Sequence, residues 1–164
     1  MTTHYDPEAE LLERGVTVYE WELEYANAVT DVEAAVWVDP RLLQRERRAT
    51  LAHELEHFHI HEEAPGRLGP GVESWFKPSV EAECNERAAV KLISFEALVD
   101  ACKWADSIEE AAEELHVNDE MVRARLRTLT KAETRTFDYQ VGRGYAARLR
   151  GRPLERRTPL RRKA

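Results

Sequence analysis

The sequence has only two cysteines among its 164 residues, Cys84 and Cys102. Their spacing fits neither a zinc knuckle nor a redox pair, so we expect two reduced thiols in the core of a cytosolic protein. The chain also lacks an apolar run close to the ~20 residues of a membrane-spanning helix. Its first residues lack a basic start followed by an apolar run. The sequence therefore predicts a soluble cytoplasmic protein without a membrane partner.

Outside the C-terminus, acidic residues outnumber basic residues two to one. Residues 143–164 hold nine Lys or Arg and the single acid Glu155, a net charge of +8, so a chain of formal charge −7 carries −15 elsewhere. An acidic body argues against a protein that binds nucleic acid with its whole surface, whereas the basic end leaves local contact with nucleic acid or an acidic partner open. We interpret residues 135–164 as a basic tail and expect it to be disordered.

The strongest chemical signal lies in residues 41–63, which contain no helix breaker. If they form one helix, His53 and His57 stand one turn apart on the same side and can bind one metal ion together. The opposite side is apolar, which gives the helix a core side and a chemical side. The apolar stripe consists of Leu51, Leu55 and Phe58.

Two histidines at this spacing supply two of the three protein ligands that a catalytic zinc ion takes. Glu54 lies beside them, and its carboxylate can accept a proton from the water that attacks a carbonyl group. Glu54 is therefore the candidate general base. A pair of histidines at this spacing also arises by chance on the solvated face of a charged helix, so a third ligand must decide between the two interpretations.

A second helix is predicted over residues 80–93, with Ser79 as its N-cap. Glu81 is the candidate third ligand, because it lies on a face that runs from polar into apolar residues. The alternative is a charge that the helix dipole favours. Glu83 points to the opposite side of the helix from Glu81, and His61 lies too far along the first helix to share the ion with His53. Both remain the next candidates for the third ligand if Glu81 is not that ligand. The face in question contains Glu81, Asn85, Ala88 and Leu92.

The other segments predict a small sheet and several short helices. Residues 106–134 resemble a helix-turn-helix, in which the first helix is acidic and the second carries three arginines, Arg123, Arg125 and Arg127. Contact with DNA and packing against the preceding domain are both open for this segment. The predicted elements are helices over 6–14, 95–104, 107–115 and 119–129, strands over 16–23 and 34–38, and a loop or short extra strand within 24–32.

Two segments together resemble the ImmA/IrrE family of metallopeptidases: RRATLAHELEH at residues 47–57 and EAECNERAA at residues 81–89. The resemblance implies an α+β fold. Its expected form is a zincin-like metallopeptidase domain over residues 1–105, with a small β-sheet packed on the histidine-bearing helix and short helices after it. The resemblance also implies a Zn²⁺ ion held by His53, His57 and Glu81, with Glu54 as general base.

The function that the resemblance implies is that of a zinc-dependent endopeptidase. Its expected substrate is a helix-turn-helix transcriptional repressor of a phage or mobile element. Several positions depart from the family pattern: Glu56 stands where Gly is usual, Arg87 where Phe is usual and Ala49 where an aromatic residue is usual, and residues 91–94 replace the usual Leu-Leu-Met-Pro. The departures at Glu56 and Arg87 bear on function. These departures motivate an alternative, a regulatory protein without proteolytic activity that binds a repressor or DNA and keeps the metal site for structure.

Overall fold

The computed structural model of the chain describes residues 5–31, 34–65, 77–142 and 145. The described residues form an α+β structure, so the predicted fold class is confirmed. Residues 66–76 and most of the expected basic tail lie outside them. The elements in chain order are α1 (Pro7–Glu13), β1 (Thr17–Glu20), β2 (Ala28–Thr30), β3 (Ala35–Val38), α2 (Gln44–Glu63), α3 (Pro78–Leu92), α4 (Phe95–Trp104), α5 (Ile108–Glu114), α6 (Asp119–Arg127) and α7 (Lys131–Val141).

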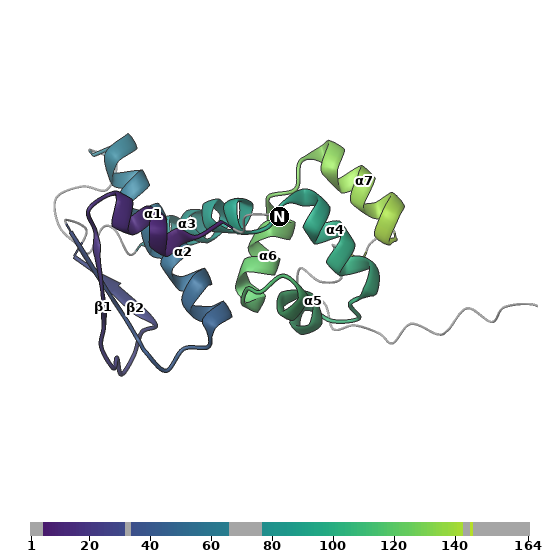
Figure 1. Ribbon diagram of the computed structural model, residues 1–164. Coiled ribbons are helices and arrows are strands. Elements are labelled where there is room, and N and C mark those ends of the chain that lie inside the picture. The colour runs from purple at the N-terminus through teal and green to yellow at the C-terminus, as the bar shows by residue number, and fades with distance from the viewer. Residues whose placement is uncertain (1–4, 32–33, 66–76, 143–144, 146–164) are drawn as a thin grey trace, which may run out of the picture.

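The three strands form one sheet in the order β1-β3-β2. β1 pairs with β3 in parallel and β2 pairs with β3 antiparallel, so β2 lies at one edge. The expected extra strand within residues 24–32 is thus present as β2. Val36 and Val38 of the central strand are fully buried against Leu51 and Leu55 of α2. The apolar side of α2 therefore covers one face of the sheet, as Figure 1 shows.

Helix α2 begins at Gln44, three residues later than the sequence suggested. The carboxylate of Asp39 accepts hydrogen bonds from both the backbone N–H and the guanidinium group of Arg41. This pairing closes a turn between β3 and the helix, and the helix can start only after the turn. From Gln44 to Glu63 it runs unbroken, so His53 and His57 do lie one turn apart.

Helix α3 starts earlier than predicted, at Pro78, and its N-cap is Lys77 rather than Ser79. Proline suits the first turn of a helix, because its fixed φ is already helical and the N–H that it lacks has no intrahelical partner there. Ser79 consequently lies inside the first turn. Glu81 follows in the same turn, and this places its carboxylate near α2.

The C-terminal helices share one hydrophobic core with α2 and α3. Of the two roles considered for residues 106–134, packing against the preceding domain is the one that the structure shows, since α6 lies along α3. Arg125 is only 5% exposed, and its guanidinium group binds the carbonyl oxygen of Ile93 and the carboxylate of Glu133. Arg125 therefore holds helices together and is not available to DNA.

Helix α7 corrects the expected start of the tail at residue 135. The helix begins with a capping box formed by Thr130 and Glu133 and continues to Val141. Phe137 is fully buried in the shared core and lies beside the ring of Tyr145. The ordered part of the chain thus extends past residue 134.

Among the described residues, no helix is both long enough and apolar enough to span a membrane.

Candidate metal centre

Three potential metal ligands from two helices converge beside the sheet. The Nε2 atoms of His53 and His57 lie 3.2 Å apart on α2. The carboxylate of Glu81, on α3, has one oxygen 3.1 Å from the Nε2 atom of His53 and the other 3.2 Å from that of His57. The structure therefore brings together all three side chains that the sequence pointed to.

The spacing of these atoms suits a tetrahedral metal ion. Zinc bound to nitrogen and oxygen at about 2.1 Å has ligand atoms about 3.4 Å apart. The three observed separations, between 3.1 and 3.2 Å, are close to this value. The buried Oε1 atom of Glu81 has no hydrogen-bond partner. A cation at the centre would satisfy this oxygen and both nitrogens, so the donor set fits a divalent metal.

Neighbouring side chains orient the two imidazole rings. The Nδ1 atom of His53 lies 2.7 Å from the Oδ1 atom of Asn85, which can only accept a hydrogen bond. The proton of His53 is therefore held on Nδ1, and Nε2 keeps a free lone pair for a metal. On the other ring, the Nδ1 atom of His57 lies 3.6 Å from the sulfur of Cys84.

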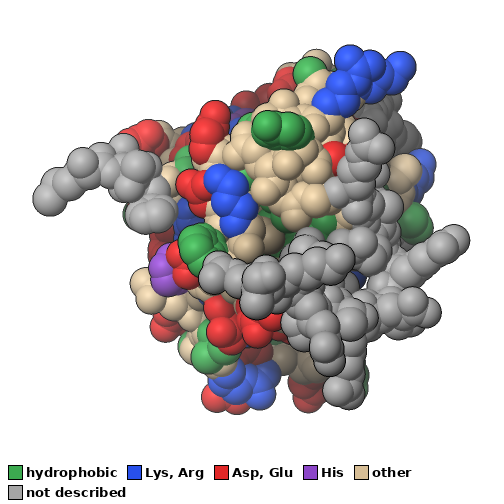
Figure 2. Space-filling view, turned by 90° about the vertical axis from the view of Figure 1, so that its right-hand side faces the viewer, with side chains coloured by type: hydrophobic (Ala, Val, Ile, Leu, Met, Phe, Trp, Pro, Cys, Tyr) green, Lys and Arg blue, Asp and Glu red, His purple; other side chains and the backbone are tan. Residues whose placement is uncertain are grey.

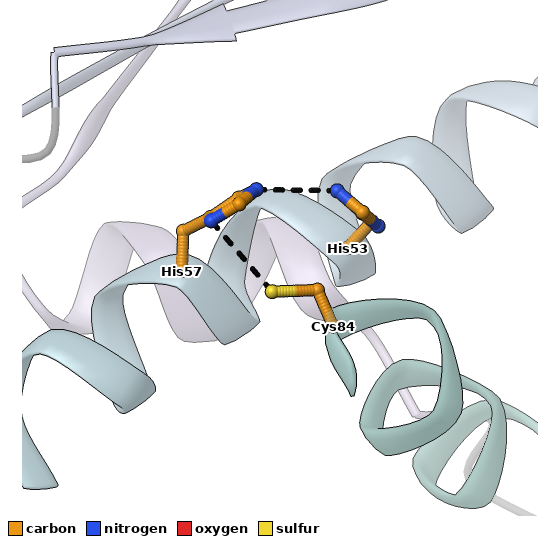
Figure 3. Close-up of side chains that lie close together, drawn as sticks. All are labelled: His53, His57 and Cys84. Carbon is orange, nitrogen blue, oxygen red and sulfur yellow. Dashed lines mark hydrogen bonds between the residues drawn. The ribbon is translucent and has the colours of Figure 1, made fainter. Parts of the chain in front are cut away.

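Cys84 is close enough to both histidines to be weighed as a ligand, since one ligand atom of each lies within 4.8 Å of the others. However, its sulfur approaches the Nδ1 atom of His57, on a different side of the ring from the Nε2 atom that faces His53 (Figure 3). Burial raises the pKa of the thiol, and Glu81 raises it further, so the weakly ligating protonated form is favoured. Glu81 fits the third position better.

The charges of the cluster depend on burial and on Glu81. Burial lowers the pKa of His57, and His53 lowers it further, which favours the neutral imidazole that binds metals. Burial also acts to lower the pKa of His53, but the contacts with Glu81 and the nearby Glu54 outweigh it and raise this pKa. Without a metal, a proton on His53 thus partly neutralises Glu81.

Glu54 lies beside this cluster and is 7% exposed. Burial raises its pKa to about 7, with a further contribution from Glu81, while His53 acts in the opposite direction. Its Oε2 atom has no hydrogen-bond partner. A carboxylate with a pKa near neutrality can both accept and release a proton at that pH, as a general base must.

Glu83 and His61 are the other candidates for the third ligand. The carboxylate of Glu83 binds the guanidinium group of Arg87. Within the described part of the chain, the group of side chains that could hold a metal is His53, His57 and Cys84, which contains none of Glu81, Glu83 and His61. Glu81 is preferred for its distances of 3.1 and 3.2 Å to the two Nε2 atoms. The roles of His53, His57 and Glu81 as ligands and of Glu54 as base stay predictions, now with a geometry that suits them.

Glu56 and Arg87, two of the departures from the family pattern, line one depression on another side of α2 and α3. Glu56 is 2% exposed, and its carboxylate contacts the ammonium group of Lys91 at 2.7 Å and the ring of His59 at 3.2 Å. Arg87 lines the same depression and binds Glu63. The carboxylate of Glu56 is therefore paired with Lys91 rather than with His53 or His57, although its charge still helps to raise the pKa of Cys84 beside His57.

A cleft of about 370 Å³ opens next to the metal centre. One wall comes from the segment before β2 and its first residue, the floor from α2 and α3, and the other wall from the start of α6. The lining residues are Tyr25, Ala26, Asn27, Ala28, Ala49, Thr50, His53, Glu54, Asn85, Asn118, Glu120 and Met121. A substrate in this cleft would lie against Glu54.

The model of one protein family, the M78 peptidases, described as the IrrE N-terminal-like domain, matches residues 15–127. The chain belongs to this family. The match includes both metal-site helices and extends through α6, which agrees with the packing of α6 on α3. Membership of the M78 family suggests a metallopeptidase, and the ligand atoms of His53, His57 and Cys84 are close enough together for a metal site. Comparisons with curated proteins and with solved structures found no match.

Sequence reasoning missed several residues of this M78 site. Asn85 was placed on the same helix face as Glu81, and that position was the available signal for its contact with His53. Cys84 was assigned to the core without a role, although it lies only one residue earlier. The wall formed by Asn118 and Glu120 had no local signal, because it depends on how α6 packs against α3.

Proposed function

We propose that the protein is a zinc-dependent endopeptidase that acts in the cytoplasm on a helix-turn-helix transcriptional repressor of a phage or mobile element. The observation that carries this proposal is the convergence of the His53, His57 and Glu81 side chains, with the unpaired carboxylate of Glu54 beside them. Peptidases of the zinc class need both parts, three protein ligands and an adjacent base.

Each side chain has a distinct task in this proposal. His53, His57 and Glu81 hold the ion, and Asn85 and Cys84 orient the two rings. Zinc, when bound, supplies a Lewis acid that polarises the scissile carbonyl group. Glu54 accepts a proton from the attacking water and passes it to the nitrogen of the leaving amine, which breaks the C–N bond without leaving an unstable anion.

The edge strand β2 can align an extended substrate beside Glu54. Asp39 donates its backbone N–H to Asn27, Asp31 donates to Ala35, and Val29 stands opposite Trp37. In an antiparallel ladder this pattern turns the N–H and C=O groups of Ala28 away from β3, toward the open edge. Ala28 also lines the cleft. A peptide that adds to this edge would pass in front of the base.

The choice of a repressor as substrate is supported by the sequence resemblance to the ImmA/IrrE metallopeptidases. A protein that fits the cleft must present an extended segment, since a helix about 10 Å wide could not pair with the edge of β2. A linker between two folded parts of a repressor meets this requirement.

The alternative, a regulatory protein without proteolytic activity, was motivated by Glu56 and Arg87. Both side chains line the depression on the other side of α2 and α3, and both are engaged in ion pairs there. They leave Glu54 and the cleft unaltered, so this motive gives the alternative no support.

The test compares the wild-type protein with a Glu54→Gln variant after both are loaded with zinc. Zinc content is measured by mass spectrometry of the metal, and cleavage is followed on purified helix-turn-helix repressors and on a library of peptides from a digested proteome. We expect equal zinc content and a loss of cleavage of at least about 1,000-fold in the variant, because it lacks the base.

Two outcomes would overturn the proposal. One is cleavage by the Glu54→Gln variant at the wild-type rate, which would place the base elsewhere. The other is the absence of cleavage by a zinc-loaded wild-type protein that still binds a repressor, which is what the non-proteolytic alternative predicts.

A further inference from the structure

The charged side chains that line the substrate cleft, apart from any bound metal ion, have one sign. Of its described lining residues, Glu54 and Glu120 carry a formal negative charge and none is Lys or Arg. The two carboxylates come from different parts of the chain, Glu54 from α2 and Glu120 from the first turn of α6. Glu54 is more than nine-tenths buried and has an oxygen without a hydrogen-bond partner. Glu120 is therefore the lining carboxylate that remains available to a substrate side chain when Glu54 serves as the base.

We propose that this cleft selects a substrate with an arginine or lysine side chain next to the scissile bond, and that Glu120 is the residue that binds this side chain. The inference rests on the proposed peptidase function and adds the class of residue that the enzyme selects.

The polar groups around Glu120 suit a guanidinium or ammonium group. Asn27 and Thr50 also line the cleft, and each carries a side-chain oxygen that can accept a hydrogen bond. The Oδ1 atom of Asn118 already accepts the backbone N–H of Met121. A guanidinium group has five N–H donors and needs several acceptors when it leaves water.

Glu120 already has a basic partner inside the protein. The guanidinium group of Arg127, two turns further along α6, contacts its carboxylate at 2.8 Å and that of Glu86 at 3.6 Å. This ion pair is half exposed, so it contributes little and can be exchanged. Arg127 shows that the carboxylate of Glu120 accepts a guanidinium group in this setting, and it competes with a substrate for that carboxylate.

The competition predicts opposite effects for two substitutions. Removing the charge of Glu120 should weaken the binding of a basic side chain, whereas removing the charge of Arg127 should strengthen it. A merely structural role of the ion pair would make the two substitutions act in the same direction, because each breaks the same contact. This difference in sign is the basis of the test.

The experiment measures binding to the zinc-loaded Glu54→Gln protein, in which cleavage is abolished by the proposed mechanism. The probes are a fluorescent pentapeptide with one central arginine and the same peptide with citrulline, which has nearly the same shape but no charge. Fluorescence anisotropy gives the ratio of the two dissociation constants. We expect the arginine peptide to bind about tenfold more tightly, as a hydrogen bond to a charged group would give.

In the same background, Glu120→Gln should reduce the preference for arginine to less than about twofold, and Arg127→Gln should increase it. Glu109→Gln is the matched control, since it removes the same charge from an exposed position on α5 outside the cleft, and it should leave the ratio unchanged. The inference is overturned if the Glu120→Gln variant keeps the full preference. It is also overturned if Arg127→Gln fails to raise the preference, or if Glu109→Gln lowers it as much as Glu120→Gln does.

A peptide library cleaved by the Glu54-containing protein separates this inference from the proposed function. Cleavage with arginine or lysine enriched at one position beside the scissile bond supports both. Cleavage without such enrichment overturns the inference alone. An absence of cleavage, with the arginine preference intact in the binding assay, overturns the peptidase function and leaves a cleft that binds basic side chains.

Discussion

The Nδ1 atom of His53 donates a hydrogen bond to the Oδ1 atom of Asn85 across 2.7 Å, and this contact joins the two helices of the metal centre. Because Asn85 lies one turn after Glu81 on α3, the residue that orients one ligand and the residue that supplies another belong to the same face of the same helix. The orientation of the His53 ring is thereby tied to the position of Glu81.

Replacing Asn85 with alanine should lower the affinity for zinc by about 10- to 100-fold, the usual effect of removing such an orienting partner. The reason is that the His53 ring loses both its fixed tautomer and its fixed direction. Competition with a chromophoric chelator measures the affinity. Val90→Ala, at an exposed position on the same helix, is the control and should have no effect. An unchanged affinity in Asn85→Ala would show that the hydrogen bond does not serve the metal.

The raised pKa of Glu54 predicts how the stability of the metal-free protein depends on pH. Folding raises this pKa from 4.5 to about 7, because burial disfavours the charged form. The contribution of Glu54 to stability is therefore fully present below pH 4.5 and is lost as the pH rises through 7. Glutamine cannot ionise, so metal-free Glu54→Gln should be more stable than the metal-free wild type at pH 8, by about 2–3 kcal/mol.

Urea unfolding in the presence of a chelator gives the two free energies of unfolding. The difference between them should shrink toward zero near pH 5, where Glu54 is protonated in the folded protein. A difference that stays constant between pH 5 and pH 8 would contradict the proposed cause, since it could not come from ionisation of Glu54.

The buried ion pair between Glu56 and Lys91 joins α2 to α3 on the side away from the cleft. Lys91→Met should destabilise the protein by about 2 kcal/mol, because it removes a partner of a carboxylate that is almost fully buried; the partial exposure of Lys91 limits the loss. The double variant Glu56→Met with Lys91→Met should recover to within about 1 kcal/mol of the wild type. Urea unfolding of the wild type, of Glu56→Met, of Lys91→Met and of the double variant tests this cycle. A double variant less stable than Lys91→Met alone would disprove it.

The contact between Asp39 and Arg41 predicts a loss of stability in acid. The guanidinium and backbone N–H groups of Arg41 hold the pKa of Asp39 well below its usual range. The stabilising effect of Asp39 is thus present above about pH 4 and is lost as the pH falls through the depressed pKa. Asp39→Asn should weaken the pH dependence of unfolding below pH 4, whereas Asp100→Asn, at an exposed site, should not. Identical acid profiles for Asp39→Asn and the wild type would refute this prediction.

Phe137 makes helix α7 part of the fold. Phe137→Ala should lower the free energy of unfolding by about 3–5 kcal/mol, the cost of a large cavity in a core. Tyr139→Ala, on the same helix but 91% exposed, should change it by less than about 0.5 kcal/mol. If Phe137→Ala were as mild as Tyr139→Ala, the start of a dispensable tail at residue 135 would be right after all.

The features that follow from local spacing could be predicted from the sequence. The unbroken run from Gln44 to Glu63 makes a helix, and the helical period alone then places His53 above His57 and buries Leu51 and Leu55. The two ends of α1 also follow from local sequence. The Asp6 side chain accepts backbone N–H groups at its start, and Gly15, with a φ of 77°, follows its end.

Features that depend on packing between distant segments could not be predicted in the same way. The sequence pattern makes Arg125 look like a DNA-contacting residue, because helical period says which residues share a face but not what covers that face. Arg125 is buried because its guanidinium group binds the carbonyl oxygen of Ile93 and the carboxylate of Glu133, which lie on other segments. Likewise, the sequence predicts a disordered tail from residue 135, because the burial of Phe137 depends on the packing of α7 against α4 and on the ring of Tyr145.

Helix α3 has a double attachment: its first turn presents Glu81 to α2, and its length supports α6, the helix that bears Glu120. A peptide bound between β2 and α6 would contact a helix that packs on α3, the helix that positions the carboxylate of Glu81. By thermodynamic reciprocity, the factor by which bound zinc changes the affinity for a peptide must equal the factor by which that peptide changes the affinity for zinc. The affinity for zinc would in this way depend on whether a substrate is bound.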